Sequence, residues 1–140
     1  MRRCTIFLVV LCLSLWGGFA LAQDPGKEKA AVTAAKKWLS LVDSGNYEQS
    51  WREAAEYFRN AVTDKQWVQS LKAVRGPLGK LMSREVKSTM YKTSLPGAPD
   101  GDYVVIQFVT SFGNKKSAIE TVTPMLEKDG SWRVSGYYIR

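Results

Sequence analysis

The hydrophobic pattern of this sequence changes its period once, near Leu78. Before this residue, apolar side chains recur every three or four positions, which is typical of helices that bury one face. After it, apolar and polar residues alternate, which is typical of β-strands. A chain whose helices come first and whose strands follow is predicted to adopt an α+β fold rather than an alternating α/β fold.

Three helices are expected in the first half, each with one apolar face toward the core. Two of them begin with capping-box sequences, Asn46–Gln49 and Thr63–Gln66, in which side chains satisfy free backbone N–H groups. Gly45 is expected to end the first helix, and Gly76–Pro77 the third. The expected buried residues are Ala31, Ala34, Ala35, Trp38, Leu41 and Val42 in the first helix; Tyr47, Trp51, Ala54, Ala55 and Phe58 in the second; and Trp67, Val68, Leu71 and Val74 in the third.

Four strands are expected in the second half, at residues 81–93, 103–112, 118–127 and 132–139. A loop rich in proline and glycine, Pro96–Gly101, separates the first two strands. Gly113–Asn114 and Asp129–Gly130 are short turn sequences of the kind that join antiparallel neighbours. The strands are therefore predicted to form an antiparallel meander, and the helices to pack on it.

The two turns allow the side chains of the last three strands to be assigned to faces. Sliding the turn at Gly113 by one residue would exchange the faces of one strand. Neither face is polar throughout, so helices on one side would leave a partly apolar face in water. This predicts either a homodimer through the outer sheet face or a curved sheet that closes on itself. One face is expected to hold Val104, Ile106, Phe108, Ile119, Thr121, Thr123, Met125, Trp132, Val134 and Tyr138, and the other Val105, Gln107, Val109, Glu120, Val122, Leu126, Arg133 and Tyr137.

Residues 1–22 have the pattern of a secretory signal peptide. Arg2 and Arg3 precede an apolar run, and Ala20–Leu21–Ala22 offers a small-x-small cleavage site before Gln23. The alternative is a retained membrane anchor, because residues 4–22 contain no charge. Cleavage is the favoured interpretation, and it predicts a periplasmic or secreted protein without a stable membrane span. It leaves a flexible lead at residues 23–29 and a single α+β domain at residues 30–140.

The composition excludes several kinds of chemistry. The chain has no histidine, and both of its cysteines lie within residues 1–22. No zinc or iron site of the usual nitrogen and sulfur type is therefore expected, and neither a thiol redox centre nor a serine–histidine nucleophile. No metal and no cofactor are predicted. Loss of Arg2 and Arg3 would lower the net charge from +7 to +5, and the remaining basic residues are dispersed, so no nucleic-acid partner is expected.

Five short segments resemble the exported bacterial domain-of-unknown-function family 4019: residues 38–47, 50–51, 75–79, 120–125 and 132–138. The resemblance extends from about residue 30 to residue 140. It implies a cone-shaped, nuclear-transport-factor-2-like or cystatin-like fold, in which helices cover the concave side of a strongly bent sheet. Folds of this shape include isomerases, dehydratases, small-ligand binders and dimerisation modules, so the resemblance alone does not assign an activity.

Two hypotheses for function remain open. The first is a non-enzymatic binding or accessory module that uses the cone cavity or the outer sheet face to bind a small apolar ligand or an envelope protein. The second is a metal-free lyase or isomerase, in which a carboxylate and a tyrosine abstract a proton next to a carbonyl. Its candidate carboxylates are Glu53, Glu56 and Glu120, and its candidate tyrosines are Tyr57, Tyr91 and Tyr138. The candidate pocket residues are Trp51, Tyr57, Arg75, Gln107, Glu120 and Tyr138, and none of them is assigned a catalytic role.

Glu120 is the most informative of these residues. It lies among β-branched residues, opposite Gln107 in the expected register, and burial would raise its pKa unless Arg75 or Arg133 paired with it. A structural, charge-paired glutamate is the commoner outcome for such a residue. A carboxylate that projects into an open hollow would favour catalysis. A core filled with tryptophan and tyrosine rings would favour interaction through the outer surface.

Overall fold

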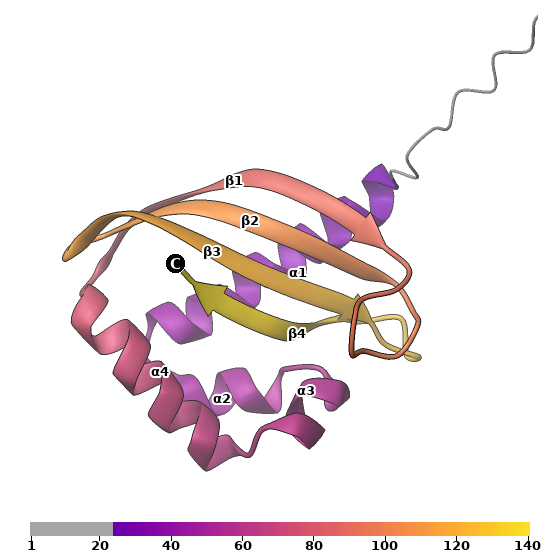
Figure 1. Ribbon diagram of the computed structural model, residues 1–140, viewed down its shortest axis with the longest axis horizontal. Helices are drawn as coiled ribbons and strands as arrows, with labels where there is room; N and C mark the ends of the chain where they lie inside the picture. Colours follow the sequence, from indigo (N-terminus) through magenta and orange to yellow (C-terminus); the bar gives the residue numbers. More distant parts are fainter. Residues whose placement is uncertain (1–23) are drawn as a thin grey trace, which may run out of the picture.

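The computed structural model describes residues 24–140, and the signal segment predicted at residues 1–22 lies outside them. The helices are α1 (Pro25–Asp43), α2 (Tyr47–Arg52), α3 (Glu56–Ala61) and α4 (Asp64–Leu78). The strands are β1 (Leu81–Lys92), β2 (Tyr103–Phe112), β3 (Lys115–Leu126) and β4 (Trp132–Ile139), and they pair antiparallel in chain order. Figure 1 shows α1 crossing behind the strands, with α2, α3 and α4 beside β4. The predicted α+β arrangement of N-terminal helices on an antiparallel sheet is confirmed. Within residues 24–140, no helix has the length and apolar character that a membrane crossing requires.

Helix α1 begins earlier than the sequence pattern suggested. Asp24 caps it, since its side chain accepts the N–H of Lys27 at 3.2 Å, and Pro25 occupies the first turn. Residues 25–29, which were expected to belong to a flexible lead, are therefore helical. The ammonium of Lys27 also contacts Asp102 at 3.1 Å, which joins the first turn of α1 to the segment before β2.

The second helix is divided into two, so the prediction of three helices is wrong. Ala55 leaves helical geometry with φ −60° and ψ 147°, and its N–H donates to the carbonyl of Val134 in β4 at 2.8 Å. Glu127 accepts the N–H of Glu56 at 2.8 Å and so satisfies the start of α3. The break buries Ala54 and Ala55 completely. The predicted capping box at Asn46 does not form, because its side chain makes no capping bond.

Helix α4 has the predicted capping box, in which Thr63 and Gln66 bond each other's backbone. It continues through Pro77 to Leu78, beyond the predicted end at Gly76–Pro77. Pro77 lies in the last turn, where its missing N–H removes a single backbone hydrogen bond. The helix ends at Gly79, whose φ is +76°. Its buried residues are Trp67, Leu71 and Arg75, whereas Val74, which was expected in the core, is 47% exposed.

The strands occupy almost the predicted residues, but the register between β2 and β3 differs. Phe112 pairs with Lys115 across the Gly113 turn, and an irregularity beyond Thr110 then shifts the pairing by one residue. Phe108 therefore lies opposite Glu120, and the prediction that Gln107 opposes Glu120 is wrong. Each side chain of β3 therefore lies on the face opposite to the predicted one. Glu120, and the residues two positions before and after it, lie toward the helices.

A second irregularity, between Thr123 and Pro124, changes the faces at the end of β4. Tyr137 pairs with Val122 and packs against the core. Tyr138 pairs with Thr121 and is 57% exposed. The prediction that Tyr138 shares a face with Val104, Ile106 and Phe108, and that Tyr137 lies on the other face, is therefore wrong.

Aromatic rings fill the space between the helices and β4. The ring of Trp38 lies 5.3 Å from that of Tyr137 and 6.1 Å from that of Trp67, and Phe58 packs edge-on against Trp67 at 4.8 Å. The indoles of Trp38 and Trp67 both donate to Ser50, to its carbonyl at 2.8 Å and its hydroxyl at 3.0 Å. Rings of this size whose N–H groups are satisfied make a dense core.

The end of α4 provides a matched test of backbone geometry. Gly79→Ala is expected to lower the free energy of unfolding by about 1–3 kcal/mol, because the residue has a backbone conformation that other residues rarely adopt. Its new Cβ would also meet Nδ2 of Asn114 at 2.9 Å. Gly76→Ala is the control: it lies within the helix with open space around the Cβ position, and it is expected to stabilise by about 0.5–1 kcal/mol. Urea unfolding of both variants measures the difference, and equal stabilities would contradict the assigned end of α4.

Candidate functional site

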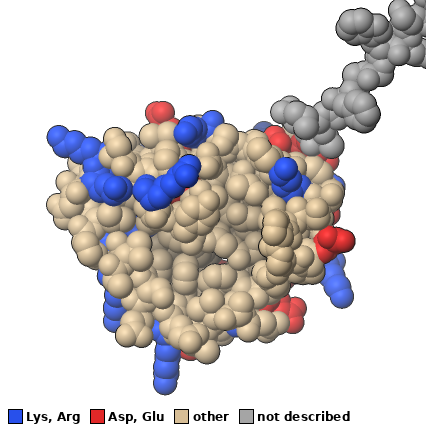
Figure 2. Space-filling model, viewed as in Figure 1, with Lys and Arg blue, Asp and Glu red and all other residues tan. Residues whose placement is uncertain are grey.

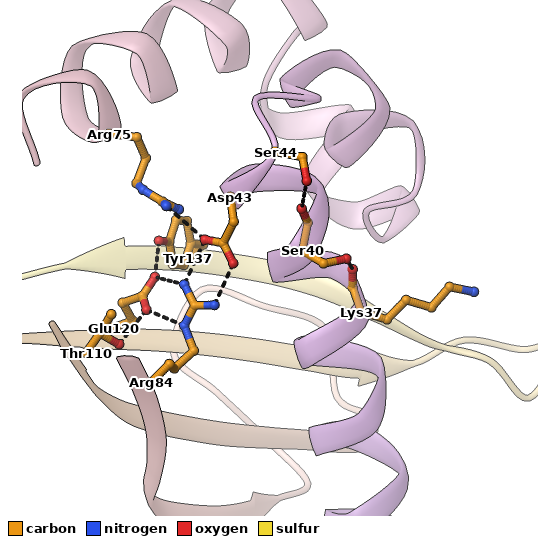
Figure 3. A network of polar contacts seen from close by, with 9 residues as sticks. All are labelled: Lys37, Ser40, Asp43, Ser44, Arg75, Arg84, Thr110, Glu120 and Tyr137. Atoms are coloured by element: carbon orange, nitrogen blue, oxygen red, sulfur yellow. Dashed lines mark hydrogen bonds and ion pairs between the residues drawn. The ribbon is translucent and has the colours of Figure 1, made fainter. Parts of the chain in front are cut away.

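Four charged side chains from four different elements meet inside the molecule. Asp43 is the last residue of α1, Arg75 lies in α4, Arg84 in β1 and Glu120 in β3. Figure 3 shows them between the helices and the sheet, together with Thr110 and Tyr137. We call these six residues the buried ion network. It holds two positive and two negative side chains, so its formal charge is zero.

Glu120 is fully buried and fully bonded. Arg84 donates to it from Nε at 2.7 Å and from Nη2 at 3.2 Å, and the Thr110 hydroxyl donates at 2.6 Å. The Tyr137 hydroxyl donates a fourth, short hydrogen bond. A carboxylate offers about four lone-pair positions. Glu120 therefore has no free acceptor position for another molecule.

Asp43 forms the second centre of the network. It accepts Nη1 and Nη2 of Arg84 at 2.7 and 2.9 Å, and Nη2 of Arg75 at 2.8 Å. Burial alone would raise the pKa of Asp43, but hydrogen bonds and charge from Arg84 and Arg75 hold it below its usual value. Because the C-terminal end of a helix disfavours a negative charge, these two arginines also offset an unfavourable position for Asp43.

Arg75 and Tyr137 complete the network. The guanidinium of Arg75 lies over the ring of Phe112, 4.8 Å from its centre, and 6% of the residue is exposed. Burial, followed by the charge and hydrogen bond of Glu120, raises the pKa of Tyr137 well above its ordinary value. Tyr137 is therefore neutral at all physiological pH values, and it acts as a donor to Glu120.

The six predicted pocket residues do not form one site. Arg75 and Glu120 belong to the buried ion network, but Arg75 bonds Asp43, and the cation that pairs with Glu120 is Arg84. Trp51 is part of the packing around the core, and its indole donates to the carbonyl of Val62 at 2.7 Å. The other three lie elsewhere: Tyr57 bonds the carbonyl of Gly97, Gln107 lies on the outer face beside Ser88, and Tyr138 is exposed.

The sequence analysis missed Asp43, Arg84, Thr110 and Tyr137. Asp43 follows Leu39 by four residues and so continues the buried stripe of α1, which is a usable signal. Arg84 and Thr110 pair directly across β1 and β2, but this requires the strand register. Arg133, the other cation proposed for Glu120, lies 3.7 Å from Glu127 instead.

The buried ion network has the chemistry of a structural element that holds the helices on the sheet. Its carboxylates are bonded to arginines, its charges cancel, and its groups come from α1, α4 and all four strands. In the described part of the chain, no group of three or more histidine, cysteine, aspartate or glutamate side chains could hold a metal ion. The network therefore fixes the positions of helices on the sheet and offers no free base to a substrate.

The sequence matches the model of the family described as "Protein of unknown function (DUF4019)" over residues 34–137. The chain belongs to this family, as the sequence resemblance indicated. No curated protein matches it. The family description defines no chemistry, so a function has to be argued from the surfaces and the interior of the molecule itself.

Removal of Arg84 tests whether the buried ion network stabilises the fold. Arg84→Met is expected to lower the free energy of unfolding by about 3–5 kcal/mol, because it leaves Glu120 buried without a cation. Arg52→Met is the control, since its pair with Glu48 is exposed and such pairs contribute at most about 1 kcal/mol. Chemical denaturation measures both losses. A loss for Arg84→Met no larger than that for Arg52→Met would contradict the role of the network.

The raised pKa of Tyr137 predicts a dependence of stability on alkaline pH. The folded state retains a phenol proton that the unfolded chain loses above its ordinary pKa of about 10, so this contribution is complete below that pH and declines above it. Tyr137→Phe is expected to be less stable at neutral pH but to lose less further stability between pH 9 and 11. Denaturation at a series of pH values measures the slopes, with Tyr138→Phe as the control that lacks the bond to Glu120. Equal slopes for Tyr137→Phe and the unaltered protein would contradict the prediction.

Proposed function

We propose that this chain is a non-enzymatic binding or accessory module of an exported protein, and that it acts through the open face of its sheet. One observation carries the proposal: the centre of the space between helices and sheet is filled by aromatic rings and the buried ion network, with a small cleft at the start of β4, whereas no described helix covers the opposite face. The pattern of residues 1–22 supports export to the periplasm or beyond. A cone-shaped plan, which the resemblance found in the sequence implies, would make this outer face the convex one.

The filled interior gives no support to the alternative of a lyase or isomerase. Such an enzyme needs a carboxylate and a tyrosine that can both reach a bound substrate. Glu120 is fully buried, and the tyrosine bonded to it is Tyr137, which packs against the ring of Trp38. Of the other candidate carboxylates, Glu56 is exposed, and Glu53 lies at a small cleft whose lining includes no tyrosine.

The open face has an uncharged centre with exposed apolar side chains. One row across the four strands is Ser88, Gln107, Thr121 and Tyr138. Met90, Val109 and Tyr138 are 54%, 47% and 57% exposed. Figure 2 shows the side of the molecule on which the strands lie in front of α1, and most charged side chains lie toward its edges. An apolar centre with a charged rim is typical of protein interfaces.

The edges of the sheet are less suited to binding than its face. Pairing along β1 is interrupted at Met82 and at Lys87, and such irregularities together with lysine discourage addition of another strand. At the other edge, the carbonyl of Val134 already accepts the N–H of Ala55. A partner therefore binds against the face rather than by extending the sheet.

The occupant that we propose for this face is a second copy of the chain. Four strands of about ten residues present about 600–700 Å² on one face, which is close to the roughly 800 Å² per partner of a standard interface. Because the centre of the face is uncharged, two copies of the chain, whose net charge is +7 in full length and +5 after loss of Arg2 and Arg3, can meet there without opposing like charges. A small apolar ligand or an envelope protein on the same face are the competing occupants.

Two valines of equal exposure allow a test of whether the open face mediates self-association. Val109→Asp is expected to weaken self-association by at least about tenfold, because the interface would bury an unpaired carboxylate. Val74→Asp is the control: both valines are 47% exposed, but Val74 lies on α4. Sedimentation equilibrium over a range of concentrations measures both variants. A protein that is monomeric at all concentrations, or equal effects of the two substitutions, would contradict the second copy as occupant.

A further inference from the structure

A cleft of about 220 Å³ lies between α1, the break that separates α2 from α3, and the start of β4. Its apolar walls include Trp38, Trp132 and Val134, and its charged residues are Lys37, Glu53 and Arg133. The cleft is separate from both the buried ion network and the open face of the sheet. Glu53 caps the end of α2, and two residues later the chain leaves helical geometry at Ala55, whose N–H bonds the carbonyl of Val134 in β4.

Two of the charged side chains at the cleft are not used by the fold. The ion pairs formed within residues 24–140 include neither Lys37 nor Glu53. Figure 3 shows the side chain of Lys37 directed away from the buried ion network. Arg133, in contrast, donates to Ser131 at 3.2 Å and lies 3.7 Å from Glu127. The cleft therefore combines one available cation, one available anion and an arginine that is already held in place.

The apolar walls are largely fixed before any ligand arrives. Trp38 is 4% exposed, and its indole donates to the carbonyl of Ser50, so its ring cannot turn without breaking the core. Trp132 is partly buried and packs against the same core. A preformed apolar surface beside two unpaired opposite charges lowers the ordering cost of binding a molecule with matching groups.

We propose that this cleft binds a small zwitterion with an apolar side chain, of the chemical class of a free aliphatic amino acid. Lys37 binds the ligand carboxylate, Glu53 binds the ligand ammonium, and the apolar side chain lies against Trp132 and Ala34, the partly exposed apolar residues of the lining. The volume is below the roughly 300–1,000 Å³ of pockets for drug-sized ligands, which suits a molecule of this size. This site goes beyond the proposed role of the sheet face and does not depend on it.

A titration with three related probes tests the site: leucine, N-acetyl-leucine, whose amine is blocked, and leucinamide, whose carboxylate is blocked. The readouts are the fluorescence and the indole N–H resonances of the tryptophans. Leucine is expected to give a saturable change, and each blocked analogue is expected to bind at least about tenfold more weakly, because a hydrogen-bonded charge pair is lost.

Two substitutions test which charged side chain of the cleft binds which charged group of the ligand. Lys37→Gln is expected to bind leucine and leucinamide with equal affinity, because it no longer recognises the carboxylate. Glu53→Gln is expected to bind leucine and N-acetyl-leucine equally, because it no longer recognises the ammonium. Lys36→Gln is the matched control, an exposed lysine on α1 outside the lining, and it is expected to bind all three probes like the unaltered protein.

Three results would overturn the proposal. These are no saturable change with leucine at millimolar concentration, equal binding of all three probes by the unaltered protein, and loss of discrimination in Lys36→Gln equal to that in Lys37→Gln. Val109→Asp separates this test from that of the sheet face. It is expected to bind leucine normally even though its self-association is weakened. If the unaltered protein is monomeric at all concentrations but binds leucine, the proposed dimer is contradicted and the cleft is still supported.

Discussion

Arg84 is the side chain on which the arrangement of helices and sheet depends. Its guanidinium uses Nε, Nη1 and Nη2 to bond two carboxylates, Asp43 at the end of α1 and Glu120 in β3. A guanidinium is planar and presents its donors in a fixed fork, so the two acceptors can occupy only a few positions around it. The end of α1 is therefore held at a set place over the sheet. Any shift of α1 would leave a buried charge without its partner.

The same interaction accounts for the register of the sheet. A regular ladder extended from the Gly113 turn would place Gln107 opposite Glu120, with Glu120 on the outer face. The irregularity beyond Thr110 instead turns Glu120 toward the helices, where Arg84, Thr110 and Tyr137 all donate to it. The alternation of residues in β3 could not reveal this, because both of its faces carry apolar or threonine side chains. Register here is decided by a polar contact between strands, which no single strand encodes.

The fold was predictable where the signal is local. The change of period near Leu78, the Thr63 capping box and the turn residues placed the strands and α4 to within a few residues. The division between α2 and α3 was not predictable, because Ala55 leaves the helix to bond Val134, 79 positions later in the chain. The candidate site follows the same rule. Glu120 was recognised from its apolar neighbours, but its cation could not be chosen among several arginines without the strand pairing.

The buried network also has a consequence for the surfaces proposed to bind other molecules. A buried polar network whose carboxylates are all bonded favours one packing over its alternatives, so the side chains around it are held in place, although Nε and Nη1 of Arg75 have no hydrogen-bond partner among the described residues. Trp38 connects the core with the cleft. Its ring packs on Tyr137 and Trp67, and the residue also lines the cleft between α1 and β4. The cleft wall is thus part of the core. The open face of the sheet is fixed in the same way through Glu120, whose neighbours in β3, Ile119 and Thr121, lie on that face. The interior, although closed to ligands, therefore determines the shape of both surfaces.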